Sequence, residues 1–142
     1  MTRLLIDTHL VLWWLNGDPR LPQPVVKRLQ APEAEVFVSQ ASLLEMAIKA
    51  SIGRLQVDLP ELERQVPLQG FRWLPISNAH LLAVGDLETD GAHRDPFDRL
   101  LVCQSRVEPM LLLTLDTQLR SYGATPHHEI DVTPFRSLQK NQ

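Results

Sequence analysis

The sequence lacks the features that define several common classes of protein. It has a single cysteine, Cys103, so no disulfide can form within the chain. The apolar run near its start, residues 10–15, is far shorter than the roughly 20 residues that a membrane-spanning helix needs. There is no repeat of fixed period and no low-complexity tract. These absences exclude a disulfide-stabilised scaffold and a repeat protein, and we expect a cytoplasmic protein with no membrane segment.

Positive charge is also scarce. The chain has 14 lysines and arginines against 17 aspartates and glutamates, for a net charge of −3. A passive nucleic-acid-binding domain is expected to carry a basic surface, so the composition argues against one. It does not argue against an enzyme that meets phosphate through a bound metal ion and a few arginines.

The chain is long enough for one domain with a full hydrophobic core, at 142 residues of which 44% are hydrophobic. We expect that domain to span residues 1–133 and to be followed by a polar tail, residues 134–142. Short apolar runs that suit buried strands alternate with segments of helical periodicity. Strands are predicted at residues 3–7, 35–39, 71–76, 111–116 and about 129–132. Helices are predicted at residues 9–15, 24–29, from a cap at Ser39 or Ser42 to about residue 51, and at 59–67, 78–87, 95–107 and 118–122.

This alternation predicts an α/β fold with a parallel sheet and a ligand crevice at the carboxyl ends of the strands. Local signals predict helix ends and faces. Thr8 is expected to cap the first helix and Pro67 to end the fourth. In the third helix, Leu43, Leu44, Ala47 and Ile48 are expected to pack inward.

Five acids fall near the predicted crevice. Asp7 and Asp116 end their strands, Glu45 lies about a turn into the helix that follows the second strand, and Asp95 and Asp98 open another helix. Each has a purely structural alternative. Asp95 suits a helix N-cap before Pro96, with Asp98 completing a capping box, and Glu45 suits an exposed salt bridge to Lys49 four residues later.

The acids together indicate more than capping. Carboxylates that crowd together repel and raise one another's pKa, so a cluster of this size implies a neutralising cation. Oxygen ligands favour Mg²⁺ or Mn²⁺ over zinc. The implied chemistry is hydrolysis of a phosphodiester by a metal-activated water.

Four blocks of sequence occur in order: LLIDTH at residues 4–9, SQASLLEMAIK at 39–49, HRDPFDRLL at 93–101 and TLD at 114–116. Together they resemble the PIN-domain ribonucleases, and most of all the VapC-type toxins of bacterial type II toxin–antitoxin modules. The resemblance covers roughly residues 3–124. It implies a three-layer α/β/α sandwich around a parallel sheet, Mg²⁺- or Mn²⁺-dependent cleavage of RNA, neutralisation by a cognate antitoxin, and a homodimer.

The resemblance also implies site residues. The family's four metal-binding acids fall on Asp7, Glu45, Asp98 and Asp116. Residues expected in supporting roles are Asp95 as cap or alternate ligand, Thr8 and Thr114 orienting a carboxylate or water, Arg94 and Arg99 contacting phosphate, and His93 assisting proton transfer. The sequence departs from the family at its end, where His127 and His128 precede the tail; adjacent residues of a strand point to opposite faces, which disfavours a shared metal.

Two alternatives remain open. A phosphatase of the haloacid-dehalogenase type also begins with an aspartate after its first strand, but it needs a second aspartate where this chain has His9. A PIN-like domain that binds RNA or protein without cutting is the other, and four intact acids argue against it. For an antitoxin contact, the aromatic and apolar residues of the first two helices are the expected surface, Trp13, Trp14 and Val25 among them.

Overall fold

The computed structural model describes residues 1–88, 95–124 and 130–131, and its strands form one parallel sheet. The strand order is β3-β2-β1-β4-β5, and each neighbouring pair is parallel. The strands are β1 (Thr2–Ile6), β2 (Ala34–Ser39), β3 (Arg72–Leu74), β4 (Leu111–Leu113) and β5 (Ile130–Asp131). The predicted α/β class is therefore confirmed, and β3 lies at the edge of the sheet, where a strand followed by proline is tolerated.

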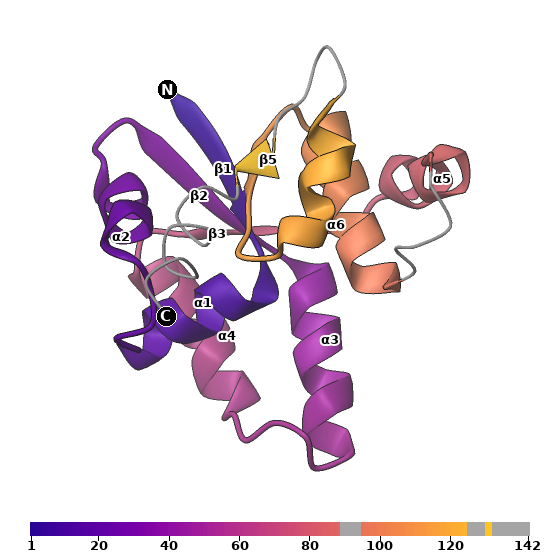
Figure 1. The fold of residues 1–142 in the computed structure, drawn as a ribbon. Coiled ribbons are helices and arrows are strands. Elements are labelled where there is room, and N and C mark those ends of the chain that lie inside the picture. The colour runs from indigo at the N-terminus through magenta and orange to yellow at the C-terminus, as the bar shows by residue number, and fades with distance from the viewer. Residues whose placement is uncertain (89–94, 125–129, 132–142) are drawn as a thin grey trace.

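Helices cover both faces of this sheet (Figure 1). They are α1 (Thr8–Asn16), α2 (Gln23–Gln30), α3 (Gln40–Ser51), α4 (Leu59–Leu68), α5 (Asn78–Asp86), α6 (Pro96–Val107) and the 3-10 helix η1 (Thr117–Ala124). No helix in these described ranges is long and apolar enough to cross a membrane. His93, Arg94, His127, His128 and residues 134–142 lie outside the described residues.

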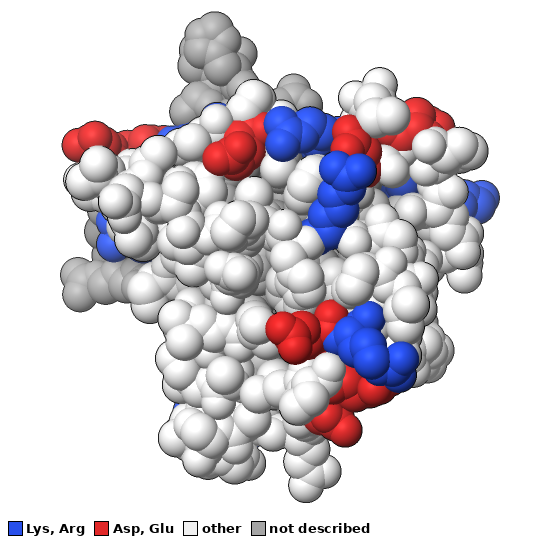
Figure 2. All heavy atoms as spheres, turned by 180° about the vertical axis from the view of Figure 1, so that it is seen from behind, with Lys and Arg blue, Asp and Glu red and all other residues white. Residues whose placement is uncertain are grey.

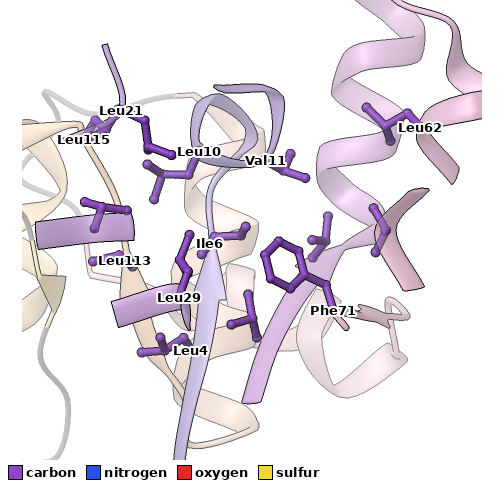
Figure 3. Close-up of a cluster of buried hydrophobic side chains, with 14 of the residues drawn as sticks. Leu4, Ile6, Leu10, Val11, Leu21, Leu29, Leu62, Phe71, Leu113 and Leu115 are labelled. Carbon is purple, nitrogen blue, oxygen red and sulfur yellow. The ribbon is translucent and has the colours of Figure 1, made fainter. Parts of the chain in front are cut away.

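Alternation along β1 divides the core into two layers, because successive residues of a strand point to opposite faces. Leu4 and Ile6 pack with residues of α1, α2 and α4 (Figure 3). Leu5 points the other way and packs with α6 and η1. The three-layer α/β/α arrangement expected from the resemblance is thus confirmed.

The buried face of α3 differs from the predicted one. Ala41, Ser42, Glu45 and Met46 are buried, whereas Leu44 is 49% and Ile48 43% exposed. The prediction holds for Leu43, which packs against the core, and is wrong for Leu44 and Ile48 because it assumed that all apolar residues of this helix lie on its inner face. Hydrogen bonds to the Glu45 side chain hold that acid inward instead, and the helix cannot also turn Leu44 and Ile48 inside.

Two helix ends also differ from the predictions. The N-cap of α1 is Asp7 and not Thr8, since the Asp7 side chain accepts a hydrogen bond from the Leu10 N–H. Pro67 lies inside α4, which continues to Leu68. Proline has no N–H to offer the carbonyl four residues earlier. The indole N–H of Trp73 reaches that carbonyl, Glu63 O, at 3.4 Å, and so the helix does not have to stop there.

Candidate active site at the carboxyl edge of the sheet

A pocket of about 550 Å³ opens where β1 and β4 end and where α1, α3, α6 and η1 begin or pass. All five acids singled out in the sequence line it. The lining residues are Asp7, Thr8, His9, Trp13, Glu45, Lys49, Asp95, Asp98, Leu115, Asp116, Thr117 and Gln118. The predicted convergence of the carboxylates on one edge of the sheet is therefore found.

Asp7 is fixed by hydrogen bonds to both of its oxygens. Oδ1 accepts from Leu10 N at 3.0 Å, and Oδ2 accepts from the Thr114 hydroxyl at 2.6 Å and from Leu115 N at 3.4 Å. The Thr114 hydroxyl also accepts from Asp116 N at 3.0 Å, so it ties the two strand-end acids together. Burial raises the pKa of Asp7, and the hydrogen bond from Thr114 opposes this most strongly.

Glu45 is held by one hydroxyl and one ammonium group. The Thr8 hydroxyl donates to Oε1 at 2.6 Å, and Lys49 Nζ donates to Oε2 at 2.8 Å. Ser42 Oγ lies 3.0 Å from the same Thr8 oxygen. The salt bridge considered as the alternative for Glu45 does form. However, the acid is only 8% exposed and lines the pocket, so it is not the exposed surface pair that the spacing suggested.

The start of α6 brings two acids to the pocket in different ways. Asp95 is exposed and caps the helix, with Oδ1 accepting from Phe97 N at 2.9 Å and Asp98 N at 3.1 Å. Asp98 is partly buried. Its burial, followed by repulsion from Asp95 and Asp116 and then from Asp7 and Glu45, raises the pKa of Asp98 from 3.8 to about 7.

Asp116 completes the group from the end of β4. Its side chain is partly buried, and Oδ1 accepts from Gln118 N at 2.9 Å, which orders the turn into η1. The acid therefore keeps a fixed place at the pocket wall through both its main chain, bonded to Thr114, and its side chain.

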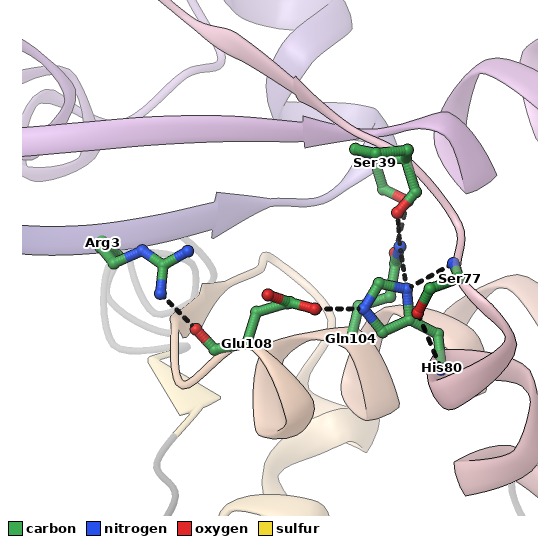
Figure 4. Close-up of polar contacts among 7 residues, drawn as sticks. Arg3, Ser39, Ser77, His80, Gln104 and Glu108 are labelled. Carbon is green, nitrogen blue, oxygen red and sulfur yellow. Dashed lines mark hydrogen bonds and ion pairs between the residues drawn. The ribbon is translucent and has the colours of Figure 1, made fainter.

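A polar network behind the pocket joins the helices that carry Glu45 and Asp98 (Figure 4). The Ser39 hydroxyl, which caps α3, is bonded to the amide oxygen of Gln104 on α6. The Gln104 amide nitrogen lies 3.3 Å from His80 Nδ1. His80 Nδ1 accepts a hydrogen bond from Ser77 N. The ring proton is therefore on His80 Nε2, which donates to the Glu108 carboxylate at 2.7 Å. Ser39, His80 and Gln104 are buried, so the network fixes the spacing of α3 and α6.

The positive groups differ from those expected. Arg99 does not line the pocket, and its Nε is buried without a hydrogen-bond partner, so the predicted contact with a phosphate in this pocket is not supported. Arg94 and His93 lie outside the described residues. Of the described residues that line the pocket, Lys49 is the one with a lysine or arginine side chain. Sequence analysis assigned Lys49 no role in the site, although its position four residues after Glu45 was the available signal.

The donor chemistry of the pocket suits a hard divalent cation. Its acidic side chains offer only oxygen, and the raised pKa of Asp98 reflects burial and carboxylate repulsion, both of which a cation would offset. Within the described ranges, no three aspartate, glutamate, histidine or cysteine side chains are grouped as a ready metal site. Glu45 and Asp7 instead bond to Lys49, Thr8 and Thr114.

A second pocket of about 480 Å³ adjoins this one. Trp13 lines both, and Trp14, Gly17, Asp18, Pro19, Leu21, Gln23, Val26 and Gln69 complete the second. The Arg20 guanidinium stacks 4.7 Å from the centre of the Trp13 ring, and Trp14 Nε1 donates to Gln69 at 3.1 Å. Val25, expected at a partner surface, is fully buried, so that part of the prediction was wrong.

The model of the PIN-domain family matches residues 4–124, which include all of the acids above, and the chain belongs to this family. Ribonuclease VapC22 of Mycobacterium tuberculosis is 28% identical over 131 residues, covering 86% of this chain and 93% of that protein.

Solved structures share the fold. VapBC2 from Rickettsia felis, bound to a DNA fragment from its promoter, superposes with a TM-score of 0.67 at 15% identity, over 92% of this chain and 98% of the other. VapBC-1 from nontypeable Haemophilus influenzae gives a TM-score of 0.62 at 16% identity, over 91% and 98%.

Proposed function

We propose that this protein is an endoribonuclease that hydrolyses RNA phosphodiester bonds with water activated by Mg²⁺ or Mn²⁺, and that it is the toxin of a toxin–antitoxin pair. The observation that carries the proposal is the convergence of five carboxylates on one pocket at the ends of β1 and β4. Membership of the PIN-domain family and similarity to a ribonuclease support RNA as the substrate.

The proposed metal ligands are Asp7, Glu45, Asp98 and Asp116. A bound ion would supply a hydroxide-like nucleophile and neutralise charge on the phosphate. The chain's own groups then orient the ligands: Thr114 holds Asp7, and Thr8 holds Glu45. Burial and the neighbouring carboxylates raise the pKa of Asp98 to about 7, and a bound ion would favour its charged form.

Asp95 is proposed to act mainly through the helix. Its carboxylate is occupied by the Phe97 and Asp98 N–H groups, and the α6 N-terminus beside it favours anions such as phosphate. Asp98 is left as the direct ligand. A metal-bound structure with Asp95 on the ion and Asp98 away from it would reverse this assignment.

For the antitoxin we propose the second pocket as the docking site. Trp13 and Trp14 line it, and aromatic residues are enriched where proteins bind one another. It joins the acidic pocket at Trp13, so a segment seated there could reach and cover the active site. The structural neighbours described as VapBC assemblies support a partner of this kind.

A homodimer is proposed through α3 and α5. Both carry large exposed apolar side chains: Leu44, Ile48 and Ile52 at or just past α3, and Leu81 and Leu82 on α5. Large apolar side chains that gather on an exposed helix face mark interaction surfaces more often than free solvent faces. Figure 2 shows one side of the molecule, on which a broad area has no lysine, arginine, aspartate or glutamate side chains.

The test is cleavage of single-stranded oligoribonucleotides of random sequence, with Mg²⁺ or Mn²⁺ and with a chelator. Asp7→Asn and Asp98→Asn should stay folded and lose cleavage by a factor of about 10² or more, since each removes a charged ligand. The matched control is Asp86→Asn, at an exposed acid outside the pocket. Wild-type cleavage by both pocket variants, or cleavage undiminished by the chelator, would refute the proposal. Metal-dependent RNA binding without cleavage would favour a non-catalytic module.

A further inference from the structure

Lys49, unlike an ordinary surface lysine, lines the acidic pocket and contacts one of its carboxylates. It lies on α3 one turn after Glu45, lines the acidic pocket, and places Nζ 2.8 Å from Glu45 Oε2. The other Glu45 oxygen is taken by the Thr8 hydroxyl at 2.6 Å. Both oxygens of this proposed metal ligand are therefore bonded to other side chains of the protein.

We propose that Lys49 is a mobile counter-cation of the active site, which holds Glu45 in the metal-free protein and moves to the RNA phosphate when a divalent cation takes Glu45 Oε2. The inference rests on the proposed function and adds a residue that the family's four acids do not include. It makes Lys49 a competitor of the metal and a ligand of the substrate.

The charges in the pocket favour this exchange. Five carboxylates line it, and Lys49 supplies the one lysine or arginine charge among its described lining residues. A divalent ion among the carboxylates would take over the neutralisation of Glu45 and repel the ammonium group at close range. The freed ammonium, at the solvent side of the pocket, could then pair with a phosphate that enters at the pocket mouth.

The side chain has the freedom that the exchange needs. The Lys49 side chain is 43% exposed while that of Glu45 is 11% exposed, so the lysine reaches the buried acid from the solvent side. A lysine carries its charge on a flexible four-carbon stem and can change partner without moving its helix. Thr8 has no such freedom because it is buried in the first turn of α1, and its bond would keep Glu45 oriented during the exchange.

The test replaces Lys49 with methionine, which keeps an unbranched stem and removes the charge. Mn²⁺ binding to the RNA-free protein is measured by calorimetry, and cleavage of the random oligoribonucleotides is measured at saturating Mn²⁺. We expect Lys49→Met to bind Mn²⁺ about fivefold or more tightly than the wild type, as expected from removing one positive charge a few ångström from the ion. We expect its KM for RNA to rise by a similar factor because a phosphate contact is lost.

The control is Lys27→Met, which makes the same charge change at an exposed residue of α2 outside the pocket. It should change neither quantity. Lys49→Gln, with a shorter polar side chain, should reproduce both effects. Mn²⁺ affinity in Lys49→Met that is unchanged or weaker, with wild-type binding intact, would overturn the inference and leave Lys49 as a structural partner of Glu45. Absence of Mn²⁺ binding in the wild type would overturn the proposed function and this inference with it.

Discussion

Replacing Asp98 with asparagine should make the metal-free protein more stable at pH 8 while removing its activity. Burial and the surrounding carboxylates raise the pKa of Asp98 from 3.8 to about 7. The folded protein therefore holds this proton more tightly than the unfolded chain does. The resulting contribution to the free energy of unfolding is present below about pH 4 and is lost as the pH rises through about 7.

The size of the effect follows from that difference. An interval from 3.8 to about 7 corresponds to roughly 4 kcal/mol, at about 1.4 kcal/mol for each pKa unit. More than a third of that interval lies below pH 5, and solvent screening of the partly buried carboxylate reduces the rest, so the expected difference between pH 5 and pH 8 is about 1.5 kcal/mol. Asparagine also loses a favourable charge near the N-terminus of α6, which offsets about 0.5 kcal/mol. The free energy of unfolding of Asp98→Asn, compared with that of the wild type at the same pH, should therefore be about 1 kcal/mol higher at pH 8 than at pH 5.

The assay is urea unfolding of the wild type and Asp98→Asn at pH 5 and pH 8 in the presence of a chelator, with Asp86→Asn as the control for loss of one exposed negative charge. At pH 8, adding Mg²⁺ should stabilise the wild type more than Asp98→Asn, because the ion offsets the same repulsion that the substitution removes. A variant that is destabilised equally at both pH values would refute the reasoning, since it would show that Asp98 is not under electrostatic stress in the folded protein.

Three further substitutions test other parts of the structure. Thr114→Val removes the hydroxyl bonded to Asp7 and to Asp116 N, and should cost about 1–3 kcal/mol in urea unfolding and lower cleavage; unchanged values would contradict a positioning role. Gln104→Leu removes the acceptor of the buried Ser39 hydroxyl and one contact of His80 Nδ1, and should lower the unfolding free energy by about 1–3 kcal/mol, with a smaller loss in Gln118→Leu at an exposed residue. Ile48→Glu should convert the proposed homodimer to a folded monomer in sedimentation; a dimer that persists would place the interface elsewhere.

The acidic edge of the sheet could be predicted from the sequence because each step rested on a local signal. Short apolar runs marked the strands; Asp7 directly follows β1, and Asp116 comes three residues after the end of β4. Parallel strands bring their carboxyl ends to one edge, so the two acids had to meet. Asp95 was equally readable as a cap, since the proline after it fixes the start of α6.

The resemblance predicted that Thr114 orients a carboxylate or a water, but local signals could not tell which carboxylate, and they gave Lys49 no role in the site. The Thr114 hydroxyl reaches Asp7 across more than a hundred residues of sequence, and only the pairing of β1 with β4 brings them together. The spacing of Glu45 and Lys49 did predict their ion pair. The spacing could not show which face of α3 is buried. That face determines whether the ion pair lies on the protein surface or in the acidic pocket.

The rotation of α3 links the proposed active site to the proposed dimer. Glu45 is buried on α3 together with Ala41, Ser42 and Met46, whereas Leu44 and Ile48, which lie four residues apart and share a face, point toward solvent. In the proposed dimer, Leu44 and Ile48, which the sequence pattern predicted to be buried, would be buried against a second copy of the chain. A dimer built on this face would stabilise the helix orientation that presents Glu45 to the pocket. The monomeric Ile48→Glu variant should therefore bind Mn²⁺ more weakly than the wild type, although Ile48 does not line the pocket.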